Sequence, residues 1–445
     1  MIPELLRWLE ERTGIPGAVR AFFSEEIPAS AGWAQAIGSV VLFLFFIQVF
    51  TGALLAFNYA PTPGEAYRSL NYILREVPGG RMVRGLHHWG SSLMIGAVVL
   101  HMIQVFLYGA YRKPREATWM VGVALLLITL GFGLTGYLLP WDNRAYWGTV
   151  VTTEIAGQAP LAGGYIRKLL GATGGVGAVT FAHFYALHTI LLPIFAFLLV
   201  ALHVYLVKRH GVSPAPFENR PKRKFFPEQV FRDTCAIFAV FAVLFFLAAL
   251  AGAPLEGLAD PTNTTYIPRP EWYFLFLFEL LKFFRGTAER IGSVLLPTLA
   301  VALLFSIPFL DRSRLRPVTQ STFALAAVAL SLIVGVSLTV AAVATTPHST
   351  GPDPAEAFST APSALVSGAR IFAANGCAAC HSINGVGGSL APSLNGVSQR
   401  HSRAWIAQHL EDPKSQTPGT IMPQFDLSAQ DRDLLLSYLL SLPAK

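Results

Sequence analysis

Long apolar segments separated by short polar loops dominate residues 1–345. A helix needs about 20 largely apolar residues to cross a bilayer. Seven segments meet that length: residues 34–57, 82–110, 117–139, 179–207, 230–252, 290–310 and 320–345. The pattern therefore predicts an all-α fold, a polytopic membrane bundle of seven transmembrane helices.

The two ends of the chain follow a different pattern. In residues 1–33, apolar side chains such as Leu5 and Trp8 recur at helical spacing, so we expect this segment to lie on the membrane surface. Residues 346–362 are rich in proline and polar residues, which predicts a linker. Residues 363–445 are more polar, with short helical patterns, and are expected to form a small separate α-helical domain.

Charge distribution sets the expected orientation. Only 13% of the residues are charged, and the net charge is +7. Many of the basic residues gather in three loops between the spans. These are Arg112, Lys113 and Arg115 after the second span, Lys208, Arg209, Arg220, Lys222, Arg223 and Lys224 after the fourth, and Arg312, Arg314 and Arg316 after the sixth. Basic loops face the cytoplasm. We therefore expect the N-terminus inside, the C-terminal domain outside, and no nucleic-acid partner.

Four histidines lie within the apolar spans. His87 and His101 are fourteen residues apart in the second span, and His188 and His203 are fifteen apart in the fourth. Such intervals place each pair on one helix face, at depths about 21 Å apart. Two such helices facing each other could hold a low-spin haem between imidazoles at each depth. A single histidine could instead only pack between helices, but matched pairs favour ligands because ionisable groups in membranes are usually functional.

The same interval recurs in glycines on the other two early spans. Gly38 and Gly52 are fourteen residues apart in the first span, and Gly122 and Gly136 are fourteen apart in the third. A flat macrocycle needs backbone without side chains beside it, although glycine also serves close packing of membrane helices. Combined with the histidines, the glycines favour two haem sites.

The C-terminal region contains the motif Cys377-Ala-Ala-Cys380-His381, which fits covalent attachment of a c-type haem. The two thiols would bind the vinyl groups and His381 would be an axial ligand. The remaining cysteine is Cys235, and no second ligand pair with zinc-site spacing is present.

A glutamate stands in an aromatic loop after the fifth span, within Pro270-Glu271-Trp272-Tyr273. Burial there would raise its pKa towards values useful for accepting a proton. The alternative is an interfacial glutamate that caps a helix.

Residues 84–119, the run GLTGYLLPWD at 133–142 and FYALHTILLP at 184–193 resemble the cytochrome b family of quinol–cytochrome c oxidoreductases. The fifteen-residue step is similar to the bf type of this family. The resemblance covers residues 1–345 and implies a four-helix di-haem core at 34–225 and a three-helix quinol-site region at 226–345.

The resemblance also implies roles for individual residues. His87 and His188 would hold an outer haem b, His101 and His203 an inner one, and Arg84 would pair with a haem propionate. Glu271 would accept a proton from quinol, in the signature formed with Pro270, Trp272 and Tyr273. Arg232 and Asp233 would contact the quinone reduced at the inner face, or would simply be charges at a helix start.

Two positions depart from the family pattern. Ala36 stands where the chloroplast type has the cysteine that attaches an additional haem, so that thioether cannot form. His183 stands where the family usually has arginine.

The C-terminal domain resembles class I cytochromes c. That resemblance implies Met422 as the sixth ligand of the haem, although Met422 could instead fill the core. Covalent haem is attached outside the cytoplasm in this family, and an odd number of spans places the motif there.

Together these features predict the cytochrome b and c subunit of a quinol–cytochrome c oxidoreductase in a bacterial inner membrane. Quinol would be oxidised outside in a Q cycle, with electrons passing through two b haems across the membrane and through a c haem to an acceptor such as another cytochrome c. A Rieske cluster needs two Cys and two His that the chain cannot supply, so that protein must be a separate partner. By the same resemblance we expect a homodimer within a larger complex.

Two other functions share part of this pattern. A transmembrane di-haem wire that anchors a dehydrogenase would share the histidines but would not need the Glu271 loop. A transporter with a sensory cytochrome would leave the matched histidines and glycines unexplained.

We predict that a pyridine haemochrome spectrum of the purified protein shows about two protohaems for each covalently bound haem, because two imidazole pairs and one thioether motif are present. Finding thioether-linked haem alone, with no extractable protohaem, would contradict the assignment of the four histidines.

Overall fold

The computed structural model describes residues 2–29, 31–212, 222–261, 266, 269–284, 288–311, 322–345, 363–375, 377, 381–383, 386–387, 392–417, 422, 425 and 427–443. Helices dominate, with two short antiparallel ribbons. In the described part of the chain, seven helices are long and apolar enough to cross a membrane: Trp33–Ala56, Gly80–Leu107, Glu116–Tyr137, Ala178–His210, Glu228–Ala251, Ile291–Leu310 and Leu325–Ala344. The predicted all-α polytopic bundle is confirmed.

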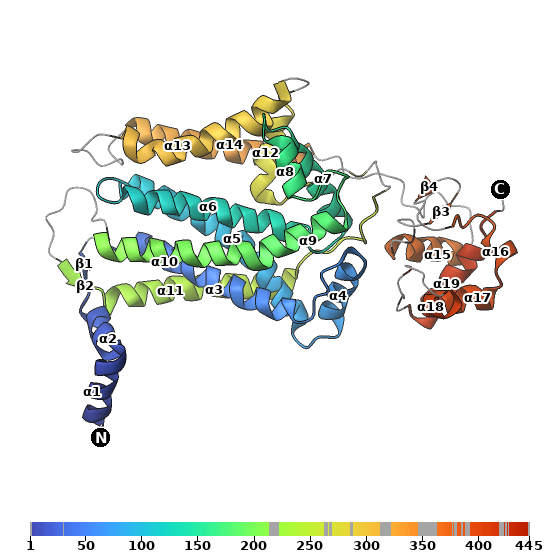
Figure 1. Ribbon diagram of the computed structural model, residues 1–445, viewed down its shortest axis with the longest axis horizontal. Coiled ribbons are helices and arrows are strands. Elements are labelled where there is room, and N and C mark those ends of the chain that lie inside the picture. Colours follow the sequence, from blue (N-terminus) through green and yellow to red (C-terminus); the bar gives the residue numbers. More distant parts are fainter. Residues whose placement is uncertain are drawn as a thin grey trace.

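The first four spans form one group of packed helices (Figure 1). Helix α3 packs along α5, and α6 packs along α10. The elements of this half are α1 (Ile2–Thr13), α2 (Ile15–Ser24), β1 (Glu26–Pro28), η1 (Trp33–Gln35), α3 (Ala36–Ala56), α4 (Pro63–Arg75), α5 (Gly80–Leu107), α6 (Glu116–Tyr137), α7 (Asn143–Gly157), α8 (Gly163–Leu169), α9 (Ala178–Ala186), η2 (Leu187–Leu191) and α10 (Leu192–His210).

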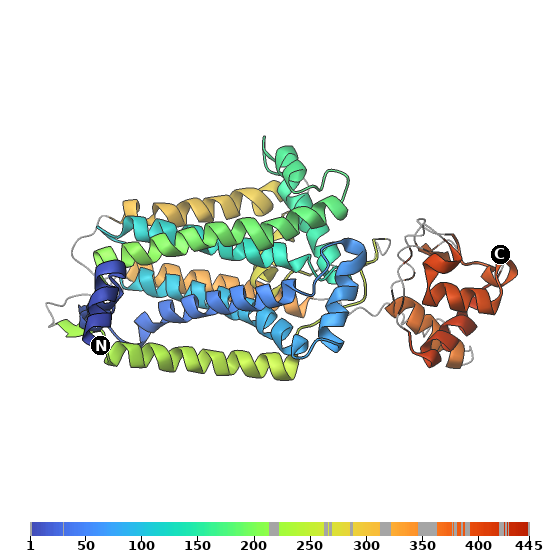
Figure 2. The same ribbon diagram turned by 60° about the horizontal axis from the view of Figure 1, so that its bottom comes forward.

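The remaining spans pack around this core. Helix α11 packs on α3, its η3 extension packs on α5, and α12 packs on α14. Their elements are β2 (Lys222–Lys224), α11 (Glu228–Phe246), η3 (Leu247–Ala251), α12 (Trp272–Leu281), η5 (Ile291–Leu295), α13 (Leu296–Leu310) and α14 (Thr322–Ala344). Figure 2 shows the long helices running nearly parallel.

The fourth span contains a π-helical turn, η2, which carries His188. Pro193 has no N–H to donate to the carbonyl four residues earlier, and the N–H of Leu192 instead reaches the carbonyl of Leu187, five residues back. A π-turn accommodates one extra residue in a helix. The fifteen-residue step from His188 to His203 therefore covers about the same rise as the fourteen-residue step in α5.

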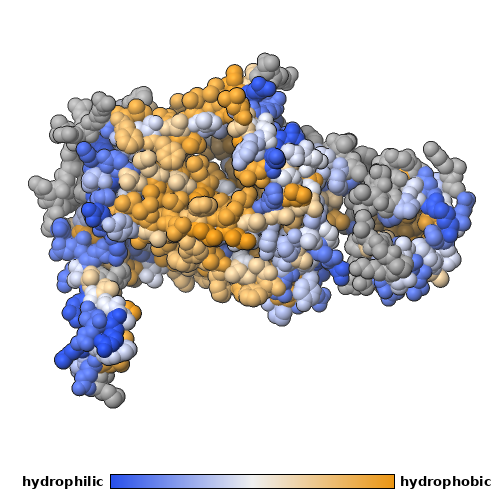
Figure 3. All heavy atoms as spheres, viewed as in Figure 1, coloured by the Kyte–Doolittle hydropathy of each residue, from blue (hydrophilic) through white to orange (hydrophobic). Residues whose placement is uncertain are grey.

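On the face shown in Figure 3, apolar residues cover the middle of the bundle, and polar residues gather at its two ends. Large apolar side chains such as Phe50, Leu198 and Leu250 are more than half exposed on the spans. A soluble surface would not expose so large an apolar patch, so this apolar surface is the part that faces lipid or other membrane subunits.

The C-terminal domain has its own core. Leu435, Leu436 and Phe372 are buried in it, where α15 crosses α19. Gly368 permits this close crossing, because a Cβ there would lie 2.3 Å from the carbonyl oxygen of Leu434. The elements are α15 (Ser363–Ala374), β3 (Ser382–Ile383), β4 (Val386–Gly387), α16 (Val397–Arg400), α17 (Arg403–Glu411), α18 (Pro413–Gln416) and α19 (Ala429–Leu440).

Candidate haem clamps and quinol site

Each of the four glycines singled out in the sequence faces one of the four histidines. In the outer pair, a Cβ atom on Gly52 would lie 3.1 Å from Cε1 of His87, and one on Gly136 would lie 2.6 Å from Cε1 of His188. In the inner pair, a Cβ atom on Gly38 would lie 3.3 Å from Cε1 of His101, and one on Gly122 would lie 3.5 Å from Cε1 of His203. At Gly52 and Gly136 the ring would have to move to admit a side chain, at Gly38 it would have to move slightly, and at Gly122 the distance is an ordinary van der Waals contact. The repeated interval therefore corresponds to four imidazole rings lying against bare helix backbone.

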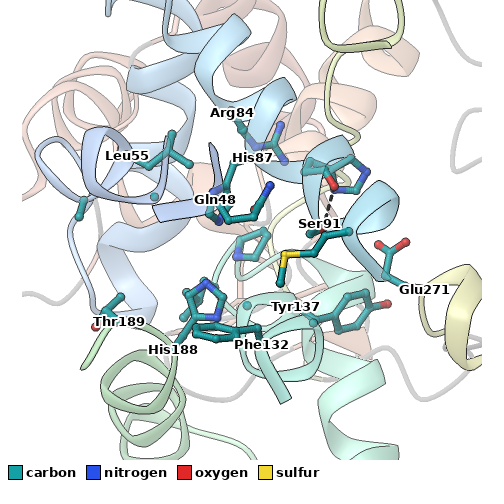
Figure 4. A pocket seen from close by; sticks show the side chains of 18 of the residues that line it. Gln48, Leu55, Arg84, His87, Ser91, Phe132, Tyr137, His188, Thr189 and Glu271 are labelled. Carbon is teal, nitrogen blue, oxygen red and sulfur yellow. Dashed lines mark hydrogen bonds between the residues drawn. The ribbon is translucent and has the colours of Figure 1, made fainter. Parts of the chain in front are cut away.

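The rings of His87 and His188 face each other across the bundle (Figure 4). Their ring centroids are 6.2 Å apart, with the ring planes at 77°. Two imidazoles bound from opposite sides to one metal ion through bonds of about 2 Å would have centroids about 6 Å apart. The arrangement fits a single iron between the two rings.

Hydrogen bonds fix the tautomers of this outer pair. The hydroxyl of Thr51 donates to the carbonyl of Ile47 at 2.6 Å, so its oxygen accepts from Nδ1 of His87, 3.0 Å away. The hydroxyl of Thr135 likewise donates to Gly131 at 2.8 Å and accepts from Nδ1 of His188 at 3.1 Å.

Protonation at Nδ1 leaves the Nε2 lone pair of both rings available for a metal. Both rings therefore fit bis-imidazole haem ligation.

The inner pair lies about four helical turns further along α5 and the fourth span. His101 and His203 have buried Nδ1 atoms without a hydrogen-bond partner among the described residues. The backbone at Gly38 and Gly122 leaves space beside these rings as it does beside the outer pair. The inner rings thus share the glycine contacts of the outer pair, and their role as haem ligands stays a prediction.

One cavity of about 440 Å³ joins the outer histidines to the predicted quinol residues. His87 and His188 line it together with Glu271, Tyr273 and Tyr137. This volume lies within the range of about 300–1,000 Å³ that is typical of ligand sites. The two sites predicted separately are thus parts of one space.

Glu271 occupies the N-cap position of α12, but its side chain makes no cap hydrogen bond. Its carboxylate oxygen Oε1 lies 3.3 Å from Nη2 of Arg144, at the start of α7, and the Glu271 side chain is 17% exposed. The geometry does not support the alternative of a helix-capping glutamate. Burial raises the pKa of Glu271; Arg144 opposes this rise and Asp142 adds to it.

The other residues of the loop surround this carboxylate. Tyr273 is buried, and its hydroxyl lies 2.9 Å from the position of a Cβ on Gly133. Burial also raises the pKa of Tyr273, which keeps the phenol protonated at neutral pH. Pro270 lines a small adjacent cavity with Tyr273, whereas Trp272 is 46% exposed and packs edge-on against the Tyr273 ring.

Arg84 lines the same cavity and is buried. It donates from Nη1 to the carbonyl of Ala253 at 2.8 Å and from Nη2 to that of Pro254 at 2.7 Å. A guanidinium has five N–H donors, so these bonds leave donors for an anionic group such as a propionate.

The residues expected at the inner quinone site lie at the opposite end of the bundle, at the start of α11 (Figure 1). Asp233 accepts hydrogen bonds from Oγ of Ser39 at 2.9 Å and from Nε2 of Gln229 at 2.8 Å. Arg232 donates to the carbonyl of Ala31 at 3.2 Å. The bond to Ser39 ties α11 to α3 and the bond to Ala31 ties it to the N-terminal segment, while contact with a quinone stays a prediction.

In the C-terminal domain, Nδ1 of His381 lies 2.8 Å from the carbonyl oxygen of Pro392. A carbonyl can only accept, so Nδ1 carries the proton and Nε2 is left to bind a metal. Cys377 and Met422 both pack against the core of this domain. Cys380 lies outside the described residues.

Comparison with known proteins identifies the family. Residues 23–211 match the family described as cytochrome b/b6/petB, residues 258–354 that of cytochrome b(C-terminal)/b6/petD, and residues 365–443 that of cytochrome c. The cytochrome bc complex cytochrome b subunit of Chlorobaculum thiosulfatiphilum is 35% identical over 313 residues, which cover 68% of this chain and 73% of the relative. The chain belongs to the cytochrome b family.

Further similarities agree. Cytochrome b6 of Chlamydomonas reinhardtii is 37% identical over 206 residues, or 46% of this chain and 96% of the relative. A solved structure titled hyperthermophilic respiratory Complex III superposes with a TM-score of 0.69 and 28% identity, covering 77% of this chain and 91% of that one.

The family assigned from the sequence, with a fused cytochrome c domain, is therefore confirmed. This cytochrome b is a multi-pass membrane electron-transfer subunit of the bc type, whose domains imply haem b and haem c.

Three residues of this cytochrome b site were missed by sequence reasoning. Thr51 and Thr135 each directly precede a glycine that faces a histidine, so the repeated Thr-Gly pair was a signal that could have found them. Arg144 had no such signal, because its contact with Glu271 depends on how two distant loops meet.

We predict that Gly136→Ala removes much of the outer haem b and lowers the ratio of protohaem to covalent haem from about two towards about one. The reason is steric: the new Cβ would lie 2.6 Å from Cε1 of His188, whose ring is held by Thr135. Haem content and the reduced-minus-oxidised spectrum check this. Gly96→Ala in α5 is the control, because nothing lies within 4 Å of its Cβ position. Full haem content in the Gly136 variant would show that the close contact does not constrain the ring.

Proposed function

We propose that this chain is the quinol-oxidising subunit of a quinol–cytochrome c oxidoreductase that works by a Q cycle with proton translocation. The observation that carries the proposal is the single cavity lined both by His87 and His188 and by Glu271 and Tyr273. A proton acceptor and a pair of iron ligands open onto the same space. Such a site suits the oxidation of a molecule that gives up electrons and protons together.

The proposed cofactors follow the donor sets. His87 with His188, and His101 with His203, would each hold one non-covalent haem b. Cys377 and Cys380 would attach one haem c, and His381 and Met422 would be its axial ligands. When bound, these haems supply the electron transfer across the membrane and towards an acceptor such as another cytochrome c.

The side chains of the chain itself perform three tasks in this proposal. Thr51 and Thr135 hold the outer imidazoles in the tautomer that presents Nε2. The carboxylate of Glu271 accepts the proton that leaves a quinol hydroxyl. Tyr273 and Tyr137 shape the wall beside it, and the hydroxyl of Tyr137 donates to the carbonyl of Arg269 at 2.6 Å, which anchors the loop.

The proposed orientation places Glu271 on the outer, periplasmic side of a bacterial inner membrane. Of the basic loops, the described strand β2 (Lys222–Lys224) lies at the other end of the bundle (Figure 1), which by its charge would face the cytoplasm. There, Arg232 and Asp233 would contact the quinone that is reduced. Nη1 of Arg269 donates to the carbonyl of Ala342 at 2.8 Å, so α14 ends beside the Glu271 loop and leads to the cytochrome c domain from the outer end.

The proposed partners are a separate Rieske iron–sulfur protein and a second copy of the chain within a larger complex. The similarity to a cytochrome bc complex subunit supports an assembly of several subunits. Copurification of a Rieske protein separates this proposal from a di-haem wire, which would not need one.

We expect Glu271→Gln to slow quinol oxidation by about 10²-fold, as is usual when a general base is lost. All haems should remain bound, because Glu271 makes no contact with the four histidines. Steady-state quinol–cytochrome c reductase activity of the complex and its haem spectra provide the measurement. Glu289→Gln is a matched control, since Glu289 is exposed and does not line the cavity. An unchanged rate in the Glu271 variant would refute the role of this carboxylate.

A further inference from the structure

Arg144 lies in the wall between the outer histidines and the Glu271 loop. It belongs to the first turn of α7, whose N-cap Asp142 accepts from the backbone N–H of Ala145 at 2.8 Å. The second carboxylate oxygen of Asp142 accepts from the N–H of Glu256 at 3.0 Å. These bonds fix the start of α7, and with it the point from which the Arg144 side chain extends into the cavity.

The guanidinium has two contacts that orient it. Nη2 lies 3.3 Å from Oε1 of Glu271, and Cζ lies over the ring of Tyr137, 5.8 Å from its centroid. The Arg144 side chain is 28% exposed and that of Glu271 is 17% exposed. An ion pair shielded to this degree is screened less by salt than one on the surface.

Several other polar groups surround the Glu271 carboxyl. Asp142 and Tyr137 face it from the start of α7 and the end of α6, and Tyr273 faces it from its own helix. Within electrostatic reach of Arg144 are also His88 on α5, and Glu256 with Tyr266 in the loop after η3. Arg144 is thus a cation in a cluster that also holds three carboxylates, phenols and an imidazole.

We infer that Arg144 is a positioning residue for quinol oxidation: its guanidinium holds the Glu271 carboxylate in the cavity wall and keeps it in the ionised form that can accept a proton. This inference rests on the proposed role of Glu271. The step concerned is one proton transfer, in which the O–H bond of a quinol hydroxyl breaks and an O–H bond forms on the Glu271 carboxylate.

The direction of the expected effect follows from the charges. Burial and Asp142 both raise the pKa of Glu271, and Arg144 lowers it. Without the guanidinium, the carboxyl would face Asp142 uncompensated and would bind its proton up to a higher pH. The fraction of enzyme able to accept a proton would then fall at a higher pH than in the wild type.

The test is the pH profile of quinol oxidation by the complex with Arg144→Gln, Arg144→Lys and wild-type chains. The Gln variant should move the acid limb of kcat upward by about one pH unit or more, the usual effect of losing an opposite charge at 4–6 Å. Its kcat at high pH and its KM for a short-chain quinol should stay within about threefold of wild type. The Lys variant keeps the charge and should restore most of the shift. A residue that only packs would change haem content or KM and leave the acid limb in place.

Arg167→Gln is the matched control. Arg167 pairs with Glu154 at 3.0 Å and is 30% exposed, much like Arg144, but it does not line the cavity. Its acid limb should coincide with that of wild type.

The outcomes separate this inference from the proposed function. If Glu271→Gln slows oxidation but Arg144→Gln leaves the acid limb unmoved, the role of Arg144 is wrong and that of Glu271 stands. If Glu271→Gln has no effect, the proposed proton acceptor is wrong, and the role of Arg144 with it. If the Arg144→Gln variant loses haem, the Arg144→Lys variant still provides the test. If that Lys variant keeps its full haem content but its acid limb moves up by about one pH unit, the inference is overturned, because the charge is retained.

Discussion

The contact between an imidazole ring and a bare stretch of helix backbone, repeated at Gly38, Gly52, Gly122 and Gly136, is the constraint on which the membrane core depends. An ionisable ring inside a bilayer is costly unless other groups satisfy it. Here the same glycines that give each ring its place also let α3 approach α5 and α6 approach α10. The contacts that pack these helices are therefore the same contacts that position the proposed haem ligands.

The part of this arrangement that could be predicted from the sequence is the part that rigid helices determine. Because the rise and turn per residue of an α-helix are fixed, the interval between His87 and His101 in the sequence determines their relative positions in the structure. The longer interval from His188 to His203 was read as a family trait, and its physical reason, the π-turn before Pro193, became visible only in the structure. The contact of Arg144 with Glu271 was not predicted, because it depends on two loops whose paths no periodic pattern describes. For Cys380 the sequence offers only a motif, which predicts haem attachment. For the linker it offers only a composition, which predicts a connection between domains. Neither predicts where the atoms lie.

The shared cavity explains why a charged pair is retained at the edge of an apolar bundle. A carboxylate alone in such surroundings would be neutralised by burial, since the loss of water favours the protonated form. Arg144 offsets this loss, and the partial burial that raises the pKa of Glu271 also strengthens the attraction of the guanidinium. The two effects oppose each other, so the balance between them decides how much of the carboxylate is present at neutral pH.

The cytochrome c domain is attached to the same end of the bundle as the Glu271 loop. Helix α14 ends beside the Glu271 loop, where Arg269 donates to Ala342. Residues 346–362, taken as a linker, could reach at most about 60 Å when fully extended. A domain tethered over such a distance meets its neighbours at an effective concentration of about millimolar, whatever its bulk concentration. If His381 holds a haem and Glu271 acts as proposed, the fusion would keep an electron carrier at the same end of the bundle as the Glu271 loop and would remove one diffusional step between quinol and acceptor.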